Sequence, residues 1–274
     1  MNLKSDGRQT SRGHLDKRVL DALSRSGKPV IRAHDLENIL DFSRAASNLI
    51  LARLCNKGWI QRLSSGAYRI VPLGSDSANP IPEDAWAIAT ELLSPCYISG
   101  WTAAEHWELT EQVFNSTVVF TAKKQRRKEL IISGLKYITK SIATENIFGV
   151  EKIWSSNVPI KIADIHRTII DILDDPEIGG GGRQVVDIFK EYCQRKEANP
   201  EKLCEYAETL GHGAVFKRLG FIGEKLTQFP QHLLLRLHSN IKTGVIKFDP
   251  TGPNSGPILV KWGIRINIPL GDIT

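Results

Sequence analysis

The sequence predicts an α+β protein with two domains: a small N-terminal domain of three helices and a hairpin, then a larger mixed domain with a mainly antiparallel sheet and a helical C-terminal half. Its 274 residues suffice for two domains of ordinary size. In the larger part, β-rich segments form one block and helix-periodic segments the next, an order typical of α+β folds. A hydrophobic share of 41% and a charged share of 24% exclude a disordered, collagen-like or coiled-coil chain.

Three helices are expected in the N-terminal domain. Apolar residues recur at helical spacing in three segments, at residues 15–25, 33–40 and 44–57. Ser43 is a favourable N-cap for the third segment, and Gly58 is a typical stop signal after it. We expect residues 1–14, which precede the first helix, to form a disordered arm.

A hairpin is expected after the third helix. Residues 59–63 and 67–71 are rich in β-favouring side chains, and Ser64, Ser65 and Gly66 lie between the two runs. Three short helices followed by a hairpin predict a winged helix-turn-helix over residues 15–75. In such a domain the third helix enters the major groove of DNA, and the hairpin lies along the backbone or the minor groove.

Positive charge is concentrated in this first domain. Residues 1–75 hold 13 Lys and Arg against 6 Asp and Glu, whereas the rest of the chain holds 23 against 24. A surplus confined to one segment favours a local surface that binds a polyanion, the alternative being an ordinary solvated surface. Because the charge and the predicted fold agree, double-stranded DNA is the expected partner.

The side chains opposite the buried stripe of the third helix would face the DNA. Asn48 and the arginines can pair with base edges or phosphates. The candidate DNA contacts are Ser43, Arg44, Ser47, Asn48, Arg53 and Lys57 on the third helix, with Arg62 and Arg69 on the hairpin. Since winged helices also dock proteins, a protein-binding surface that includes Leu49 is the alternative.

The second domain is expected at residues 83–274, after a linker at residues 76–82 that is rich in Pro, Ser, Asp and Asn. Strands are expected at residues 96–98, 114–121, 130–139, 150–154, 158–162 and 258–266. Helices are expected at residues 82–93, 102–109, 165–173, 183–196, 200–210, 214–227 and 232–240.

A run of cations lies between two of these predicted strands. It consists of Lys123, Lys124, Arg126, Arg127 and Lys128. Such a run is a candidate contact for nucleic-acid phosphates or for a partner, without base specificity. The alternative is an exposed loop that only connects two strands.

Candidate catalytic residues are few. Asp164, His166 and Asp171 share a predicted helix, but no nucleophile or metal-ligand cluster accompanies them, so we expect Asp164 to be an N-cap. The four glycines at residues 179–182 lack the Lys-Ser/Thr of a phosphate-binding P-loop and are expected to form a turn. The sequence therefore predicts a protein that is not an enzyme and has no catalytic residues, metal or cofactor.

Location is predicted from what the sequence lacks. No apolar run approaches the length of a membrane span, and the N-terminus is too polar for a signal peptide. The four cysteines are far apart and show no C-x-x-C spacing, as expected for reduced thiols. We therefore expect a cytoplasmic protein without a membrane partner.

Several segments, in this order and spacing, resemble the AbiEi family of type IV antitoxins. They are Gly-Trp-Ile-Gln-Arg-Leu at residues 58–63, Gly-Ala-Tyr at 66–68, Tyr-Ile-Ser-Gly-Trp-Thr-Ala-Ala at 97–104, Ile-Ala-Asp-Ile-His-Arg-Thr-Ile-Ile-Asp at 162–171, and Arg-Leu-Gly-Phe at 218–221. The resemblance extends from about residue 15 to about residue 268.

This resemblance implies a bacterial transcriptional autorepressor whose winged helix binds repeats in its own promoter. It also implies a role in phage defence, with a second domain that counteracts a nucleotidyltransferase toxin without a stable complex. Two other functions stay open: a nucleic-acid-processing enzyme that uses the winged helix as a targeting module, and a winged-helix repressor that senses a small effector.

Overall fold

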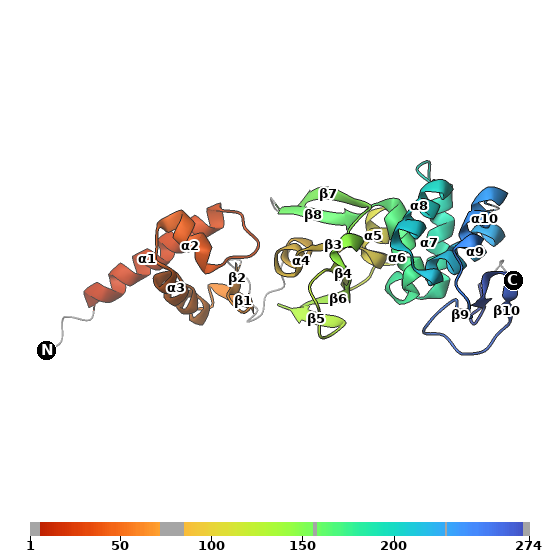
Figure 1. Ribbon diagram of the computed structural model, residues 1–274. Coiled ribbons are helices and arrows are strands. Elements are labelled where there is room, and N and C mark those ends of the chain that lie inside the picture. The colour runs from red at the N-terminus through yellow and green to blue at the C-terminus, as the bar shows by residue number, and fades with distance from the viewer. Residues whose placement is uncertain (1–5, 72–84, 156–157, 228, 271–274) are drawn as a thin grey trace. The chain divides into compact units, whose positions relative to one another are not determined.

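The computed structural model describes residues 6–71, 85–155, 158–227 and 229–270 (Figure 1). The chain divides into two units. The first consists of residues 1–92 with the segments 129–137 and 153–160, and the second of residues 93–128, 138–152 and 161–274. The predicted linker at residues 76–82 lies outside the described residues.

Three helices and a hairpin occupy the N-terminal part of the first unit. They are α1 (Asp6–Arg25), α2 (Ala33–Leu40), α3 (Arg44–Asn56), β1 (Ile60–Ser64) and β2 (Ala67–Ile70). The two strands pair in antiparallel register, and Ile31 bridges to Tyr68 on the outer side of β2. These elements form the predicted winged helix-turn-helix.

Helix α1 is longer than the predicted helix at residues 15–25. It begins at Asp6, so residues 6–14, expected to be a disordered arm, are helical, and residues 1–5 lie outside the described part. Residues 6–14 contain no apolar side chain. Hydrophobic periodicity, which locates the rest of this helix, therefore gives no signal there.

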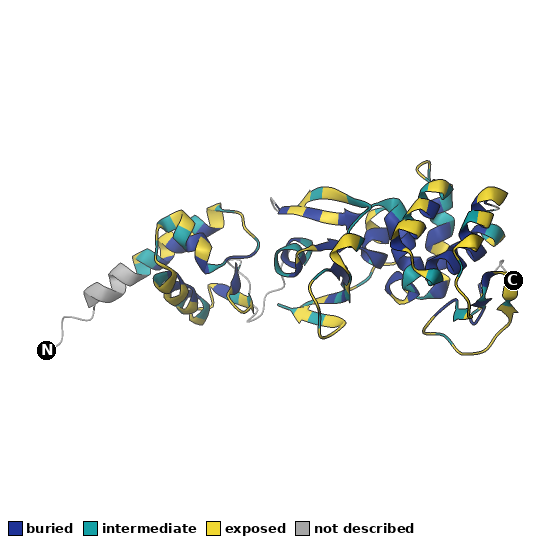
Figure 2. Ribbon diagram, viewed as in Figure 1, coloured by how far each residue is buried: buried dark blue, intermediate teal, exposed yellow. Residues whose placement is uncertain are grey.

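Local signals set the ends of α3. The Ser43 Oγ accepts a hydrogen bond from the Ala46 backbone N–H at 3.3 Å, which makes Ser43 the N-cap that the sequence predicts. After the helix, Gly58 has a φ of 74°, a conformation that glycine adopts without strain. Leu54, on the inward face of α3, lies with Leu23 of α1 and Leu36 of α2 in a buried apolar core (Figure 2).

Helix α4 (Ala85–Leu93) belongs mostly to this first unit. Ile88 forms an apolar cluster with Val30 and with Ala67 of the hairpin. Arg32 also donates to the Glu91 carboxylate at 2.9 Å and to its backbone carbonyl at 2.8 Å. The winged helix therefore packs on α4 through apolar and charged contacts.

Six strands form the large sheet. They are β3 (Cys96–Ile98), β4 (Thr117–Thr121), β5 (Glu129–Ile132), β6 (Leu135–Ser141), β7 (Val150–Ser155) and β8 (Val158–Ala163). Their order in the sheet is β5-β6-β4-β3-β8-β7. β3 pairs antiparallel with β4 and parallel with β8, where Ile98 faces Ile162. This sheet, followed along the chain by helices, confirms the predicted α+β class.

The strand expected at residues 130–139 is instead a hairpin of β5 and β6. Ser133 and Gly134 have φ values of 53° and 81°, the left-handed conformations that a two-residue turn requires. β-favouring residues flank this Ser-Gly pair on both sides. The β-favouring residues therefore predicted one continuous strand.

Helices form most of the rest of the second unit. They are α5 (Gly100–His106), α6 (Ile165–Asp174), α7 (Gly182–Gln194), α8 (Pro200–Leu210), α9 (Gly213–Leu226) and α10 (Gln231–Ser239). All of them match predicted helices to within a few residues, and their apolar faces share one core that includes Phe189, Leu219 and Trp262. None of the helices in the described part of the chain combines the length and apolar character that a membrane span requires.

The strand expected at residues 258–266 is interrupted. It consists of β10 (Ile258–Leu259), a 3-10 turn at Val260–Trp262 and β11 (Ile264–Arg265). β11 also pairs in parallel with β9 (Ile246–Lys247), which the sequence did not indicate. Trp262 is 1% exposed in the helical core, and Gly263, which follows it, has a φ of 58°, a left-handed conformation that an extended strand cannot contain.

Arg218 ties these small strands to the helices. Its guanidinium is buried and donates to the backbone carbonyls of Leu173 at 2.7 Å, Lys247 at 3.0 Å and Phe248 at 2.9 Å. Leu173 lies at the end of α6, where helix carbonyls lack partners within the helix. Arg218 therefore caps α6 and holds β9 beside it, and burial lowers the pKa of its guanidinium to about 10.

Candidate nucleic-acid interface

Helix α3 divides into a buried and an exposed face. Ser47, Ile50, Leu51 and Leu54 are buried. The exposed residues are Arg44, Ala45, Asn48, Leu49, Ala52 and Asn56. They recur every three or four residues and so lie on one side of the helix.

The exposed face offers hydrogen-bond donors but no carboxylate. The helix sequence contains no Asp or Glu. Arg44 has an exposed side chain, with its Nη1 3.2 Å from the Glu37 carboxylate of α2, and Asn48 is exposed one turn later. Helix N-termini also favour anions such as phosphate. The N-terminal half of α3 therefore suits contact with DNA.

Arg53 and Lys57 have partners inside the domain. The Arg53 Nε donates to the Asp16 carboxylate at 2.9 Å, and the Lys57 Nζ donates to the same carboxylate at 2.7 Å. Asp16 is completely buried in α1, whereas Arg53 and Lys57 stay 32% and 40% exposed. Burial alone would raise the pKa of Asp16, but the hydrogen bonds and charges of Arg53 and Lys57 outweigh burial and lower it. Through their ion pairs with Asp16, these two cations connect the C-terminal end of α3 to α1.

Replacing Asp16 with Asn is expected to weaken the winged helix by about 2 kcal/mol, because two cations lose a buried carboxylate. The pKa of Asp16 in the folded protein lies below the ordinary value of 3.8, so Asp16 contributes fully to the free energy of unfolding above pH 3.8. This contribution is lost as the pH falls through the pKa of the folded protein. Hydrogen exchange of α3 amides in the full-length protein at several pH values measures both effects.

The control for this prediction is Asp21→Asn. Asp21 lies on the same helix, but it is exposed, and its partner among the described residues is Arg25, one turn away. Exposed pairs of this kind contribute little to stability, so this variant should keep both the protection of α3 and its acid dependence. Equal loss of protection in the two variants would contradict the assigned role of Asp16.

The two hairpin arginines lie in different surroundings. Arg62 is exposed, and its guanidinium carbon is 5.6 Å from the centre of the Tyr68 ring. Arg69 is only 5% exposed, and its Nε donates to Gln61 at 2.9 Å and to Ser133 at 3.2 Å. Burial lowers the pKa of Arg69. The structure thus leaves Arg62 accessible and gives Arg69 contacts within the first unit.

The basic run forms part of the loop between β4 and β5. Lys123, Lys124, Arg126, Arg127 and Lys128 are all exposed. Lys128 pairs with Glu177 at 2.6 Å. The five cations of this loop are thus accessible from solvent.

The acidic residues on α6 have structural partners. Asp164 is the N-cap that the sequence predicts, since its carboxylate accepts the Arg167 backbone N–H at 2.6 Å. Asp171 is buried, and its carboxylate accepts hydrogen bonds from Tyr97, Ser99 and Arg167 at 2.6–3.0 Å. Burial raises the pKa of Asp171, although Arg167 opposes this effect. The Asp171 carboxylate is therefore not accessible from solvent.

The glycine run forms a tight turn. Gly180 and Gly181 have φ values of 88° and 94°, and the Gly182 N–H donates to the Asp249 carboxylate at 2.8 Å. Asp249 therefore occupies the start of α7, where a phosphate would bind. In the described part of the chain, no group of three or more His, Cys, Asp and Glu could hold a metal ion.

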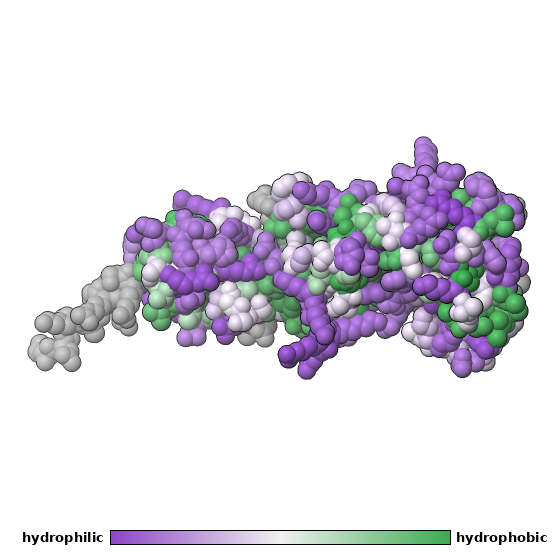
Figure 3. All heavy atoms as spheres, viewed as in Figure 1, coloured by the Kyte–Doolittle hydropathy of each residue, from purple (hydrophilic) through white to green (hydrophobic). Residues whose placement is uncertain are grey.

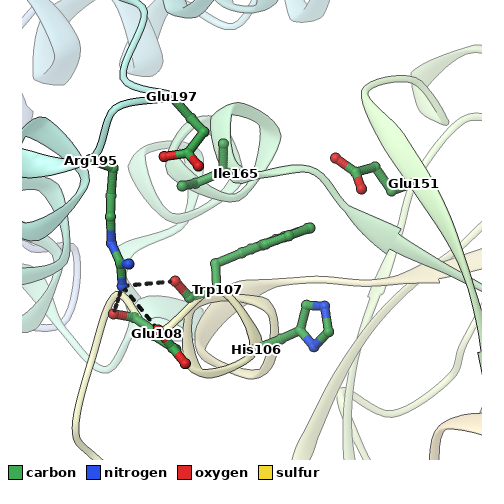
Figure 4. Close-up of a pocket in the computed structure, with 7 residues that line it drawn as sticks. All are labelled: His106, Trp107, Glu108, Glu151, Ile165, Arg195 and Glu197. Carbon is green, nitrogen blue, oxygen red and sulfur yellow. Dashed lines mark hydrogen bonds and ion pairs between the residues drawn. The ribbon is translucent and has the colours of Figure 1, made fainter.

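One pocket of about 290 Å³ opens on the second unit (Figure 4). It is lined by His106, Trp107, Glu108, Glu151, Ile165, Arg195 and Glu197. Arg195 donates to the Glu108 backbone carbonyl, and the lining contains no hydroxyl or thiol that could act as a nucleophile. The sequence did not indicate this pocket because its residues come from four segments with no shared motif.

The comparisons with known proteins agree with this fold. Residues 18–71 match the family described as "Transcriptional regulator, AbiEi antitoxin". The crystal structure of the RV2827C protein from Mycobacterium tuberculosis is similar, with a TM-score of 0.58 over 90% of this chain and 89% of that chain, at 13% identity. No curated protein matches the sequence. The resemblance is therefore confirmed over residues 18–71, where the chain matches the AbiEi antitoxin family of transcriptional regulators.

Proposed function

We propose that this protein is a DNA-binding transcriptional autorepressor and the antitoxin of a type IV toxin–antitoxin system. It acts in the cytoplasm in phage defence, binds repeats in its own promoter and counteracts a nucleotidyltransferase toxin without a stable complex. The family match at residues 18–71 supports the regulatory part. The observation that carries DNA binding is the exposed face of α3, which holds Arg44 and Asn48 and no carboxylate.

The proposed interface uses the accessible members of the predicted set. Arg44 and Asn48 enter the major groove, Arg62 lies near the backbone, and Ser43 holds the start of α3. Arg53 and Lys57 keep their pairs with Asp16 and add positive charge beside the groove. Ser47 and Arg69 support the domain from inside.

Replacing Arg44 with Ala is expected to weaken promoter binding about tenfold, because an arginine contact to a base or phosphate is lost. Fluorescence anisotropy of the full-length protein with DNA from its own promoter, at several salt concentrations, measures this effect. The matched control is Arg126→Ala in the basic run, an equal change in charge at another exposed site. A loss of affinity in the control alone would move the DNA site to residues 123–128.

The antitoxin part needs a separate experiment. Co-expression with a nucleotidyltransferase toxin from the same operon should restore growth, and the two proteins should not co-purify. A stable complex, or no rescue, would contradict the proposed type IV antagonism. Because Arg44 lies in the winged helix, Arg44→Ala should still rescue growth.

A further inference from the structure

Helix α3 exposes an apolar stripe between its polar side chains. Leu49 is 70% exposed, and Ala45 and Ala52 are exposed one turn on either side of it. These three residues lie next to Arg44 and Asn48 on the same face. In the view of Figure 3 most of the surface is hydrophilic, and on α3 an exposed leucine adds an apolar group to the polar side chains of the proposed DNA-binding face.

We propose that Leu49, flanked by Ala45 and Ala52, contacts thymine methyl groups in the major groove and determines part of the operator sequence. This inference rests on the proposed function. The C5-methyl of thymine is the apolar group that the major groove presents, and apolar side chains recognise it. Against the edge of guanine, cytosine or adenine, Leu49 would cover polar atoms without giving them a hydrogen bond.

The neighbouring side chains have base preferences of their own. Asn48 can pair with the N6 and N7 edge of adenine, and Arg44 with guanine. Cytosine is recognised through its N4 donor by a carboxylate, and α3 contains none. Asn48 and Leu49, near the middle of α3, therefore suit adenine and thymine, and Arg44 at its start suits guanine.

Charge and area favour DNA over a protein as the occupant of this face. The first 75 residues carry 13 Lys and Arg against 6 Asp and Glu, which matches a polyanion. A stable protein interface covers about 800 Å² on each partner and is depleted in alanine. The apolar stripe on α3 is one leucine between two alanines, much less than such an interface uses.

A double-mutant cycle on protein and DNA tests this proposal. The full-length protein first selects its sites from a random duplex pool, and each thymine of the selected site is then replaced by deoxyuridine, which removes only the methyl group. At one or more positions, the wild type should bind the uracil duplex about fourfold more weakly, the effect of one buried methyl. Leu49→Ala should bind the thymine and uracil duplexes equally at those positions.

The control is Leu235→Ala, which removes an exposed leucine of α10 that is 60% exposed. This variant should show the same thymine preference as the wild type. If uracil is tolerated everywhere, or if Leu49→Ala weakens both duplexes alike, the thymine contact is wrong while DNA binding stands. If the wild type binds no duplex in a salt-dependent way, the proposed function itself fails.

Discussion

Replacing Asp171 with Ala is expected to destabilise the second unit by about 3–5 kcal/mol, the usual cost of leaving one member of a buried ion pair alone. Asp171 and Arg167 are each only 1% exposed, and the Arg167 Nε donates to Asp171 at 2.9 Å. The same carboxylate accepts the hydroxyls of Tyr97 and Ser99. The Asp171→Ala variant would leave the buried Arg167 charge and the hydroxyls of Tyr97 and Ser99 without this hydrogen-bond partner.

Among the described residues, Asp171 is the one carboxylate that pairs with the Arg167 guanidinium. Its guanidinium carbon is 3.9 Å from the centre of the Phe148 ring, and its Nη1 has no hydrogen-bond partner among the described residues. The Arg167 Nη2 donates to the Tyr97 hydroxyl, which is itself held by Asp171. Loss of Asp171 therefore removes the carboxylate partner of Arg167 and the acceptor of the Tyr97 hydroxyl, while the Phe148 contact remains.

Urea denaturation of the full-length protein, followed by circular dichroism, measures the loss. Asp187→Ala is the control, since Asp187 is an exposed aspartate of α7 and its loss should change stability by less than about 0.5 kcal/mol. Equal stability of the two variants would contradict a structural role for Asp171. A folded, metal-dependent enzyme that loses only turnover in Asp171→Ala would favour the alternative of a nucleic-acid-processing activity.

Replacing Gly220 with Ala is expected to cost several kcal/mol or to prevent folding of the second unit. A Cβ at this position of α9 would lie 2.0 Å from the Trp262 ring. Trp262 cannot retreat easily, because it is 1% exposed and its indole N–H donates to Glu224 at 2.6 Å. Overpacking a close-packed core costs about 1–3 kcal/mol, and a contact this short exceeds the ordinary case.

The matched control is Gly213→Ala in the same helix. The nearest atoms to a Cβ there are those of Lys242 at 3.7 Å, an ordinary contact. Since Ala favours helices over Gly, this variant should keep or slightly raise stability. Thermal unfolding of the two variants separates them, and a Gly220→Ala protein as stable as Gly213→Ala would contradict the packing of Trp262 on α9.

Several features could be predicted from the sequence because their signals are local. Ser43 and Asp164 are N-caps as predicted, and both lie beside the helix that they cap. The helix predicted at residues 200–210 has the same first and last residues as α8. Such signals depend on residues a few positions apart, which local backbone geometry brings together in any tertiary arrangement.

The exposed face of α3 could also be predicted in part. Arg44 and Asn48 were expected outside and are exposed, since they oppose the buried stripe. Arg53 was expected on the same face, but a carboxylate 37 residues earlier in the chain holds it. No local pattern identifies Asp16 as its partner.

By itself, the sequence determined the class of the fold, the order of most helices and strands, the concentration of positive charge and the resemblance to an antitoxin family. Only the tertiary structure decided that Arg62 is exposed while Arg69 is buried, and that Trp262 leaves no room for a side chain at position 220. The physical reason is that caps, turns and periodicity act between neighbours along the chain. Burial and ion pairing depend on residues that meet only after folding.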